Sequence, residues 1–171
     1  MSLKGKIWNA VVLLIIACLW TGCGYSTSSL LRDDVHSIYV PVFDNKTWYR
    51  GLEVQLTRAI VDEVTLHTRL RIAPRDEADT ILEGELVSFE QIAAVVSSGQ
   101  DVQLTRITAA VEFRWVDNLT RREIVQKQTV RETALYPLTL AGPPGTPYGP
   151  PETLAFRQIA KRIVEKMERN W

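Results

Sequence analysis

The chain has 171 residues, of which 46% are hydrophobic, and its 20 basic and 20 acidic side chains leave no formal net charge. This length and composition are ordinary for one globular domain with a substantial core, and no second domain is needed. Because the charges balance, they supply no bulk electrostatic field, and nucleic acid is excluded as an expected partner.

The first 22 residues have the layout of a cleaved secretory signal. Lys4 and Lys6 form a positive start, an almost uninterrupted apolar run covers residues 7–20, and small residues precede Cys23. The apolar run is shorter than the roughly 20 residues that a permanent membrane-spanning helix needs. We therefore predict a signal peptide over residues 1–22, with an uncleaved single-span anchor as the alternative.

Cys23 is the predicted site of lipid attachment. The stretch Leu-Trp-Thr-Gly-Cys that ends at Cys23 resembles the lipobox of bacterial lipoproteins, in which the cysteine becomes the first residue and carries the acyl chains. Cys18 is a rival, because Ile-Ile-Ala-Cys fits the lipobox pattern more literally. Cleavage before Cys23 leaves a longer apolar run and a polar start to the mature chain, which favours Cys23.

Cleavage at that position divides the rest of the chain into a lipidated tether over residues 23–34 and a domain over residues 35–171. The tether is polar and rich in serine. Gly24 next to the cysteine, in place of Asp, resembles the signal for sorting to the outer membrane. Two or more acyl chains make a durable anchor. We therefore predict a lipid-anchored protein on the periplasmic face of the outer membrane.

The first half of the domain is predicted to contain a right-handed βαβ unit with parallel strands. Residues 36–43 are rich in β-branched and aromatic side chains and predict a strand, with Pro41 at an edge or a bulge, followed by a turn over residues 44–47. Apolar positions that share one helical face predict a helix over residues 51–67. Residues 70–73 predict a second, short strand.

The middle of the domain changes from a helical period to strict alternation. Residues 80–90 and 107–115 alternate apolar and polar side chains, which predicts strands with one face on the core and one polar face. Residues 117–120 predict a turn, and residues 122–135 predict a third, more polar strand. These segments predict an antiparallel meander.

The last part of the domain combines a proline-rich loop with a helix. Residues 136–151 hold six of the eight prolines and three of the nine glycines, so we expect a long loop outside the sheet. A lid, a contact surface and a mobile segment are the alternatives, and we predict contact with a partner. A complete apolar stripe predicts a helix over residues 152–169. The predicted fold is α+β, with two amphipathic helices packed on one face of a mixed sheet of roughly five strands.

The sequence offers no recognisable catalytic centre, and we predict no enzyme, no cofactor and no metal. His36 and His67 are the two histidines, and no cysteine remains near them after cleavage to complete a zinc site. No serine lies in a Gly-x-Ser-x-Gly motif. Glu83 and Glu85 share one strand face, where paired carboxylates can do acid–base chemistry, but a solvated face explains them better.

Four arginines are the candidate ligand-binding residues. Arg106 and Arg114 lie on the polar face of the predicted strand over residues 107–115 or next to it, and Arg121 and Arg122 follow at its turn. Clustered guanidinium groups bind phosphorylated sugar-lipids through charge-assisted hydrogen bonds. A solvated strand face is the alternative explanation for the same pattern.

Two aromatic residues and a cation precede the first predicted helix. Trp48, Tyr49 and Arg50 fit two interpretations, an exposed aromatic contact or a hydrophobic staple that closes the start of the helix. The sequence leaves both open.

Two stretches of the chain resemble the LptE family of lipopolysaccharide-assembly lipoproteins. Cys23-Gly24-Tyr25 is similar to the mature start of the family. The segment Val-Pro-Val-Phe-Asp-Asn-Lys-Thr over residues 40–47, followed by Gly-Leu-Glu from residue 51 and Leu-Thr-Arg-Ala-Ile from residue 56, is similar to its first strand and helix. The order of the predicted elements fits most of the mature chain, although only the region from Cys23 to Val64 is motif-like.

The resemblance implies a non-enzymatic role. Members of the family sit as a plug inside the lumen of the LptD β-barrel, assist its assembly, and bind lipopolysaccharide during delivery to the outer leaflet. It therefore implies an LptD-type barrel and lipopolysaccharide as partners. The lipopolysaccharide-contacting residues of the family map onto no matched motif in this chain, so the four arginines rest on strand geometry alone.

Two other functions remain open on the sequence. The first is a periplasmic lipoprotein with the same layout that serves as an accessory subunit of another secretion or efflux assembly. The second is an acyl-lipid carrier with an enclosed apolar cavity, which would show apolar residues on both faces of its strands. The polar face of residues 107–115 counts against such a cavity.

Overall fold

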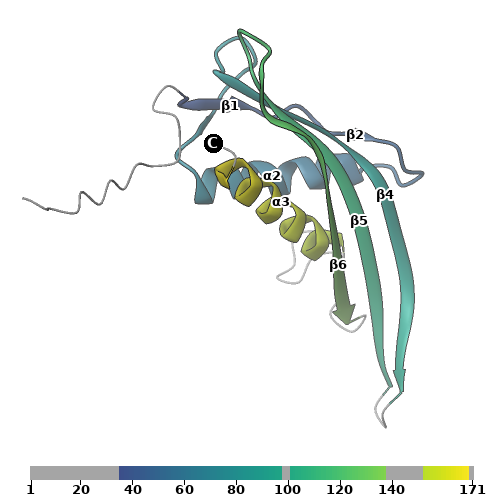
Figure 1. The fold of residues 1–171 in the computed structure, drawn as a ribbon. Coiled ribbons are helices and arrows are strands. Elements are labelled where there is room, and N and C mark those ends of the chain that lie inside the picture. The colour runs from purple at the N-terminus through teal and green to yellow at the C-terminus, as the bar shows by residue number, and fades with distance from the viewer. Residues whose placement is uncertain (1–34, 98–100, 138–151, 170–171) are drawn as a thin grey trace, which may run out of the picture.

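In the computed structural model, which describes residues 35–97, 101–137 and 152–169, one curved sheet carries two helices on its concave face (Figure 1). The predicted α+β class, with both helices on one face of a mixed sheet, is confirmed. The sheet has six strands rather than roughly five. Its order is β3-β1-β4-β5-β6, and β2 pairs with β4 off this path.

Both helices have the predicted bounds to within one residue, whereas most of the strands differ from theirs. In chain order they are β1 Ser37–Tyr39, β2 Asp44–Asn45, α2 Leu52–His67, β3 Arg71–Ile72, β4 Thr80–Ser97, β5 Asp101–Asp117, β6 Glu123–Pro137 and α3 Glu152–Arg169. The predicted signal peptide and tether lie outside the described residues, as does the proline-rich loop from residue 138 onward. Tyr136 and Pro137 belong to β6 instead of that loop. Neither helix in the described part of the chain is long and apolar enough to span a bilayer.

The predicted βαβ unit consists of β1, α2 and β3. β1 lies between β3 and β4 and runs parallel to both. The strand predicted over residues 36–43 ends early, because Pro41 has no N–H to donate to a neighbouring strand. The chain returns to the sheet at β2, where Asp44 and Asn45 pair in parallel with β4. This pairing corrects the turn predicted at these two positions.

β4, β5 and β6 form the predicted antiparallel meander, and all three strands are longer than predicted. The far ends of β4 and β5 continue as a hairpin that reaches beyond the helices (Figure 1). A bulge between Leu86 and Ser88 inserts one residue into β4 and shifts its alternation. Because of this shift, Leu86 and Phe89 both join the core.

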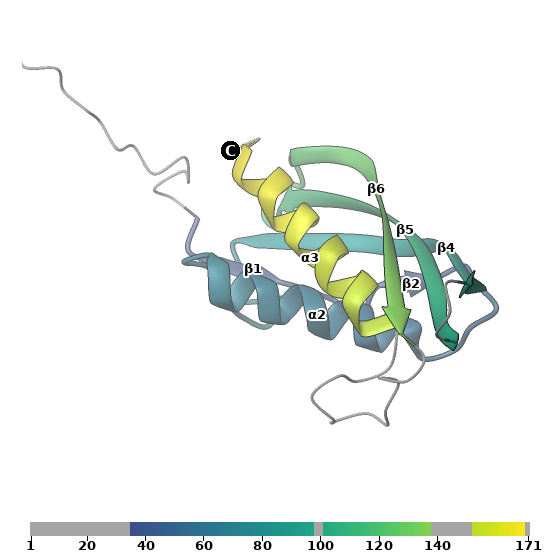
Figure 2. The ribbon, with the colours of Figure 1, turned by 90° about the horizontal axis from the view of Figure 1, so that it is seen from below.

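The core lies between the concave face of the sheet and the two helices, which cross it side by side (Figure 2). All five apolar side chains predicted to face the core from β5 are at most 1% exposed, and the stripe predicted on α3 is fully buried. From the strand these are Ile107, Ala109, Val111, Phe113 and Trp115; from the helix they are Phe156, Ile159, Ala160, Ile163, Val164 and Met167. The alternation seen in the sequence therefore predicted the inner face correctly.

Asp79 holds the start of the domain in place. Its carboxylate accepts hydrogen bonds from the backbone N–H groups of His36 and Ser37, both at 2.9 Å, and from the Ser37 hydroxyl at 2.7 Å. These bonds, the one from the hydroxyl first, lower the pKa of Asp79 below its usual 3.8. The carboxylate of Asp79 therefore fixes the position at which the chain enters β1.

A close contact between Phe43 and Gly84 joins the first half of the domain to the meander. Phe43 is 1% exposed, and a Cβ added to Gly84 would lie 2.6 Å from the carbonyl oxygen of Glu112 and even closer to the Phe43 ring. Glycine is therefore required in β4 because the ring occupies the space of its side chain. The Phe43 N–H donates to the Thr57 hydroxyl at 2.9 Å, which ties the same residue to α2.

We predict that Gly84→Ala destabilises the domain by about 3 kcal/mol, because the new methyl group overlaps both a buried ring and a backbone carbonyl. Gly51→Ala is the matched control, since nothing lies within 4 Å of its added Cβ and only its φ of 86° opposes the change. It should cost about 1 kcal/mol. Urea unfolding of both variants checks this, and equal midpoints would contradict the contact.

Candidate binding surface

The convex face of the sheet is the polar surface that the sequence predicted. It is the face opposite the helices, and its side chains come from β4, β5 and β6. Those that carry its chemistry are Glu83, Glu85, Glu90 and Ile92 from β4, Arg106, Thr108, Glu112 and Arg114 from β5, and Lys127, Arg131, Thr133 and Leu135 from β6. The half near β1 and β2 differs in chemistry from the half near the β4–β5 hairpin.

In the half near β2, arginines are held by a carboxylate. Arg114 donates to Glu83 through Nε at 3.0 Å and Nη2 at 2.7 Å. Arg121, from the turn after β5, lies 3.7 Å from the other oxygen of the same carboxylate. One glutamate therefore partly neutralises two of the candidate arginines.

Lysines compensate a pair of like charges beside this group. Glu85 and Glu112 are direct neighbours on β4 and β5, where two carboxylates repel each other. Lys46 lies 2.8 Å from Glu85, and Lys127 lies 2.5 Å from Glu112 and 3.6 Å from Glu85. The hydrogen bond from Lys46 is the largest cause that lowers the pKa of Glu85, and the bond to Glu112 is the largest that raises the pKa of Lys127.

The half near the hairpin carries a cation between two exposed apolar side chains. Ile92, Arg106 and Leu135 stand opposite one another on three adjacent strands, and we call them the distal row. Ile92 is 55% exposed and Leu135 is 52% exposed. Arg106 forms no ion pair with any residue that the structure describes. A guanidinium with apolar flanks suits an amphipathic anion, whose charged group it can bind while an apolar chain lies alongside.

Two further features extend the distal row along the convex face. The hydroxyls of Thr108 and Thr133 lie 3.1 Å apart on the neighbouring row. Arg131, opposite Ala110, is the next cation along β6, and it too has no ion pair within the described ranges. Polar groups therefore continue from the distal row toward the centre of the face.

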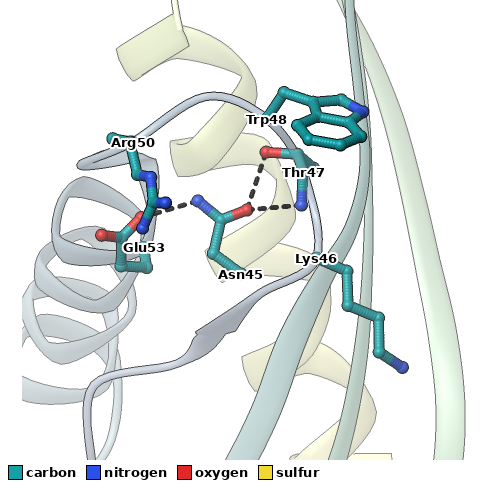
Figure 3. Close-up of a pocket in the computed structure, with 6 residues that line it drawn as sticks. All are labelled: Asn45, Lys46, Thr47, Trp48, Arg50 and Glu53. Carbon is teal, nitrogen blue, oxygen red and sulfur yellow. Dashed lines mark hydrogen bonds between the residues drawn. The ribbon is translucent and has the colours of Figure 1, made fainter.

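A second surface feature is the loop between β2 and α2, where a pocket of about 260 Å³ is lined by Asn45, Lys46, Thr47, Trp48, Arg50 and Glu53 (Figure 3). Of the two aromatic residues there, Tyr49 packs edge-on against Phe89, with ring centroids 5.1 Å apart. Trp48 is 98% exposed. Tyr49 therefore contacts β4 rather than the start of α2 and stays 49% exposed, while Trp48 is presented to solvent.

The described residues do not meet the requirements of a metal site. Across residues 35–97, 101–137 and 152–169, no three side chains of His, Cys, Asp or Glu gather closely enough to hold an ion. His67 lies 3.6 Å from Glu63 within α2, and His36 is exposed at the domain entrance. The convex face and the loop between β2 and α2 are therefore the two candidate binding surfaces.

Comparison with protein families decides the relationship of the chain. The family model for LptE, described as lipopolysaccharide-assembly, matches residues 35–170. The chain belongs to the LptE family. That match covers all the described elements, from β1 to α3, whereas the motif-like part of the resemblance ran only from Cys23 to Val64.

Solved structures share the fold of this LptE-family chain at low sequence identity. The hypothetical protein CT253 from Chlamydia trachomatis has a TM-score of 0.53 at 12% identity, covering 78% of this chain and 96% of the other. Protein XCC0632 from Xanthomonas campestris has a TM-score of 0.51 at 12% identity, covering 81% and 89%. These likenesses concern the fold alone. No curated protein sequence matches this chain.

The strand pattern of the sequence placed four arginines together. In the structure of this LptE-family member they do not all lie together. Arg114 and Arg121 meet at Glu83, and Arg122 is exposed nearby at the turn. Arg106 is eight residues from Arg114 on β5, which places it roughly 26 Å away. They lie on one face or its rim, but they do not form one cluster.

Sequence reasoning missed the residues around Arg106. Arg131 and Leu135 alternate with inward residues of β6, so the period of that strand could have placed them on the convex face. Ile92 could not be found in this way. It lies beyond the predicted end of its strand, and its position opposite Arg106 depends on the register after the bulge in β4.

We predict that Lys127→Met lowers the melting temperature at pH 7, because the Glu85–Glu112 repulsion then loses one of its two compensating lysines. The lowered pKa of Glu85 contributes stability above its usual value of 4.5 that is lost as the pH falls through the folded-state pKa. The variant lacks part of this contribution, so its deficit should shrink toward pH 4.

Melting curves of both proteins between pH 7 and pH 4 measure this. Lys161→Met is the control, since this exposed α3 lysine has no ion pair among the described residues and should change little. A deficit that stays constant over this pH range would contradict the role assigned to Lys127.

Proposed function

We propose that this chain is a lipoprotein plug of an LptD-type β-barrel that helps the barrel assemble and binds lipopolysaccharide on its way to the outer leaflet. The observation that carries the proposal is the match of the LptE lipopolysaccharide-assembly family to residues 35–170. In this proposal the role is one of binding and assembly, with no enzymatic step and no cofactor.

The two faces of the sheet support a plug. The concave face is sealed by α2 and α3, so the domain needs no partner to bury its core. The convex face is polar, and its carboxylates are largely compensated by lysines and arginines. Such a surface tolerates the wet, polar lumen of an outer-membrane barrel.

The proposed anchor is the N-terminal part of the chain. Residues 1–22 are removed as a signal peptide, Cys23 carries the acyl chains, and residues 23–34 tether the domain to the periplasmic face of the outer membrane. The family match begins at residue 35, where the tether is proposed to end. Two or more acyl chains are needed to make such attachment durable.

The proposed lipopolysaccharide site is the convex face. Arg106 of the distal row binds a phosphate, while the exposed side chains of Ile92 and Leu135 accept an acyl chain. Arg114, Arg121 and Arg122 supply further cations on the path of the headgroup. Arg114 and Arg121 contribute less, because Glu83 already holds both guanidinium groups.

The plug is tested by affinity purification of the lipidated chain from solubilised outer membranes, followed by mass spectrometry. We expect a large β-barrel of the LptD type in equal proportion. Cys23→Ser should abolish incorporation of labelled palmitate and reduce barrel recovery, whereas Cys18→Ser should do neither. Recovery of the lipidated chain without a barrel would rule out the plug function and favour an accessory subunit of another secretion or efflux assembly.

Lipopolysaccharide binding is tested by charge reversal on the convex face. Arg106→Glu should weaken binding of purified lipopolysaccharide by about tenfold or more, because one charge-assisted hydrogen bond is lost and a repulsive charge is gained. Arg157→Glu, an exposed arginine on α3, is the charge-matched control and should change binding little. Unchanged binding after reversal of Arg106, Arg114, Arg121 and Arg122 together would rule out this site.

A further inference from the structure

We call the loop over residues 46–51, between β2 and α2, the Trp48 loop. The side chains of Asn45 and Glu53 hold it through hydrogen bonds. The Asn45 amide oxygen accepts the Thr47 N–H at 2.8 Å and the Thr47 hydroxyl at 2.7 Å. Its amide nitrogen donates to the Tyr49 carbonyl at 2.6 Å. It also donates to Glu53 at 2.7 Å (Figure 3). The Gly51 N–H also donates to Glu53, at 3.1 Å, so both ends of the loop are fixed.

This loop presents the apolar side chain of Trp48, which is not buried in the core of the domain. The indole of Trp48 is 98% exposed, although the neighbouring Tyr49 packs against Phe89 of β4. An exposed tryptophan on a preorganised loop loses little conformational entropy when it is buried by a partner. Tryptophans in such positions are enriched among the residues that carry most of the binding energy of interfaces.

The Trp48 loop lies where one edge of the sheet becomes open. The Lys46 N–H donates to the Leu86 carbonyl at 3.0 Å, next to the last residue pair between β2 and β4. Beyond Leu86, β4 continues to Ser97, and among the described residues no strand pairs with this side of it. An open edge next to a fixed apolar side chain suits an added β-strand.

The charges of the loop favour a polypeptide over an anionic lipid surface. The two cations of the loop, Lys46 and Arg50, are formally balanced by Asp44 and Glu53, which flank it. Lys46 is bound to Glu85, and Arg50 is a minor contributor to the lowered pKa of Glu53, which is due first to hydrogen bonds. The loop and its flanks therefore offer no excess of cations to attract anionic headgroups. They can bind a partner through hydrophobic contact and strand pairing.

We propose that the Trp48 loop and the open edge of β4 dock an extended polypeptide segment of the β-barrel partner. The segment pairs with β4 along Ser88–Ile92, and the indole of Trp48 covers its side chains. This inference rests on the proposed function, because it names the surface of the domain that the barrel contacts. It meets the distal row only at Ile92, whose backbone belongs to the paired stretch of β4 and whose side chain lies on the convex face.

The test compares Trp48→Ala with Leu119→Ala in the lipidated chain, purified from outer membranes with its barrel. Leu119 is the matched control, since it is 93% exposed but lies in the turn between β5 and β6. The barrel should dissociate from the Trp48 variant on the order of 30-fold faster, and from the Leu119 variant at the wild-type rate. Unchanged melting curves show that both variants are folded.

A second measurement addresses the strand. Amide hydrogen exchange should slow in the complex at those positions of Ser88–Ile92 that point away from β5, and this protection should be lost with Trp48→Ala. A photo-crosslinker at position 48 should join the barrel polypeptide. Crosslinks to lipid or to a second copy of this chain, or absence of the protection, would overturn the inference.

The failures of the two proposals are distinguishable. If the wild-type chain recovers no barrel, both the proposed plug function and the proposed docking surface are wrong. If it recovers the barrel and Trp48→Ala releases it at the wild-type rate, the plug stands and the docking surface is wrong.

Discussion

The contact of the Phe43 ring with Gly84 is the constraint on which the rest of the structure depends. A side chain on residue 84 would displace the ring, and the ring carries with it the chain between β1 and β2. The N–H of Phe43 donates to Thr57, whose hydroxyl donates in turn to the Glu53 carbonyl. One missing side chain in β4 therefore sets the position of β2 and of α2 against the meander, and with them the start of the Trp48 loop.

The two faces of the sheet differ in their chemistry. The concave face is closed by the helices, whose apolar stripes meet the inward residues of β4, β5 and β6. The convex face carries charged side chains, and the way in which these charges are paired changes along the strands. Near β2, the repulsion between Glu85 and Glu112 is offset by Lys46 and Lys127. Near the hairpin, Arg106 has apolar neighbours and no acidic partner among the described residues. A ligand of mixed character is therefore best accommodated at that end.

The proposed docking surface uses the backbone edge of β4 and the proposed ligand-binding surface uses the convex face, with Ile92 belonging to both. The open edge of β4 and the fixed indole of Trp48 offer backbone pairing and apolar burial, whereas the distal row offers a charge with apolar flanks. A plug within a barrel needs both kinds of surface, one to hold its partner and one to bind the passing lipid. Placing them on an edge and a face allows both to be occupied together.

The sequence by itself determined the class of fold, both helices, the meander and the buried face of β5, because periods of 3.6 and 2 residues report directly on which side chains share a face. It also carried the resemblance to the LptE family, which the family match extends to residues 35–170. Only the tertiary structure decided the register. The bulge after Leu86 and the extension of β4 bring Ile92 opposite Arg106, and the side chains of Glu83 and Arg114 meet across two strands. Such pairings depend on contacts between residues far apart in the chain, and local periodicity does not encode them.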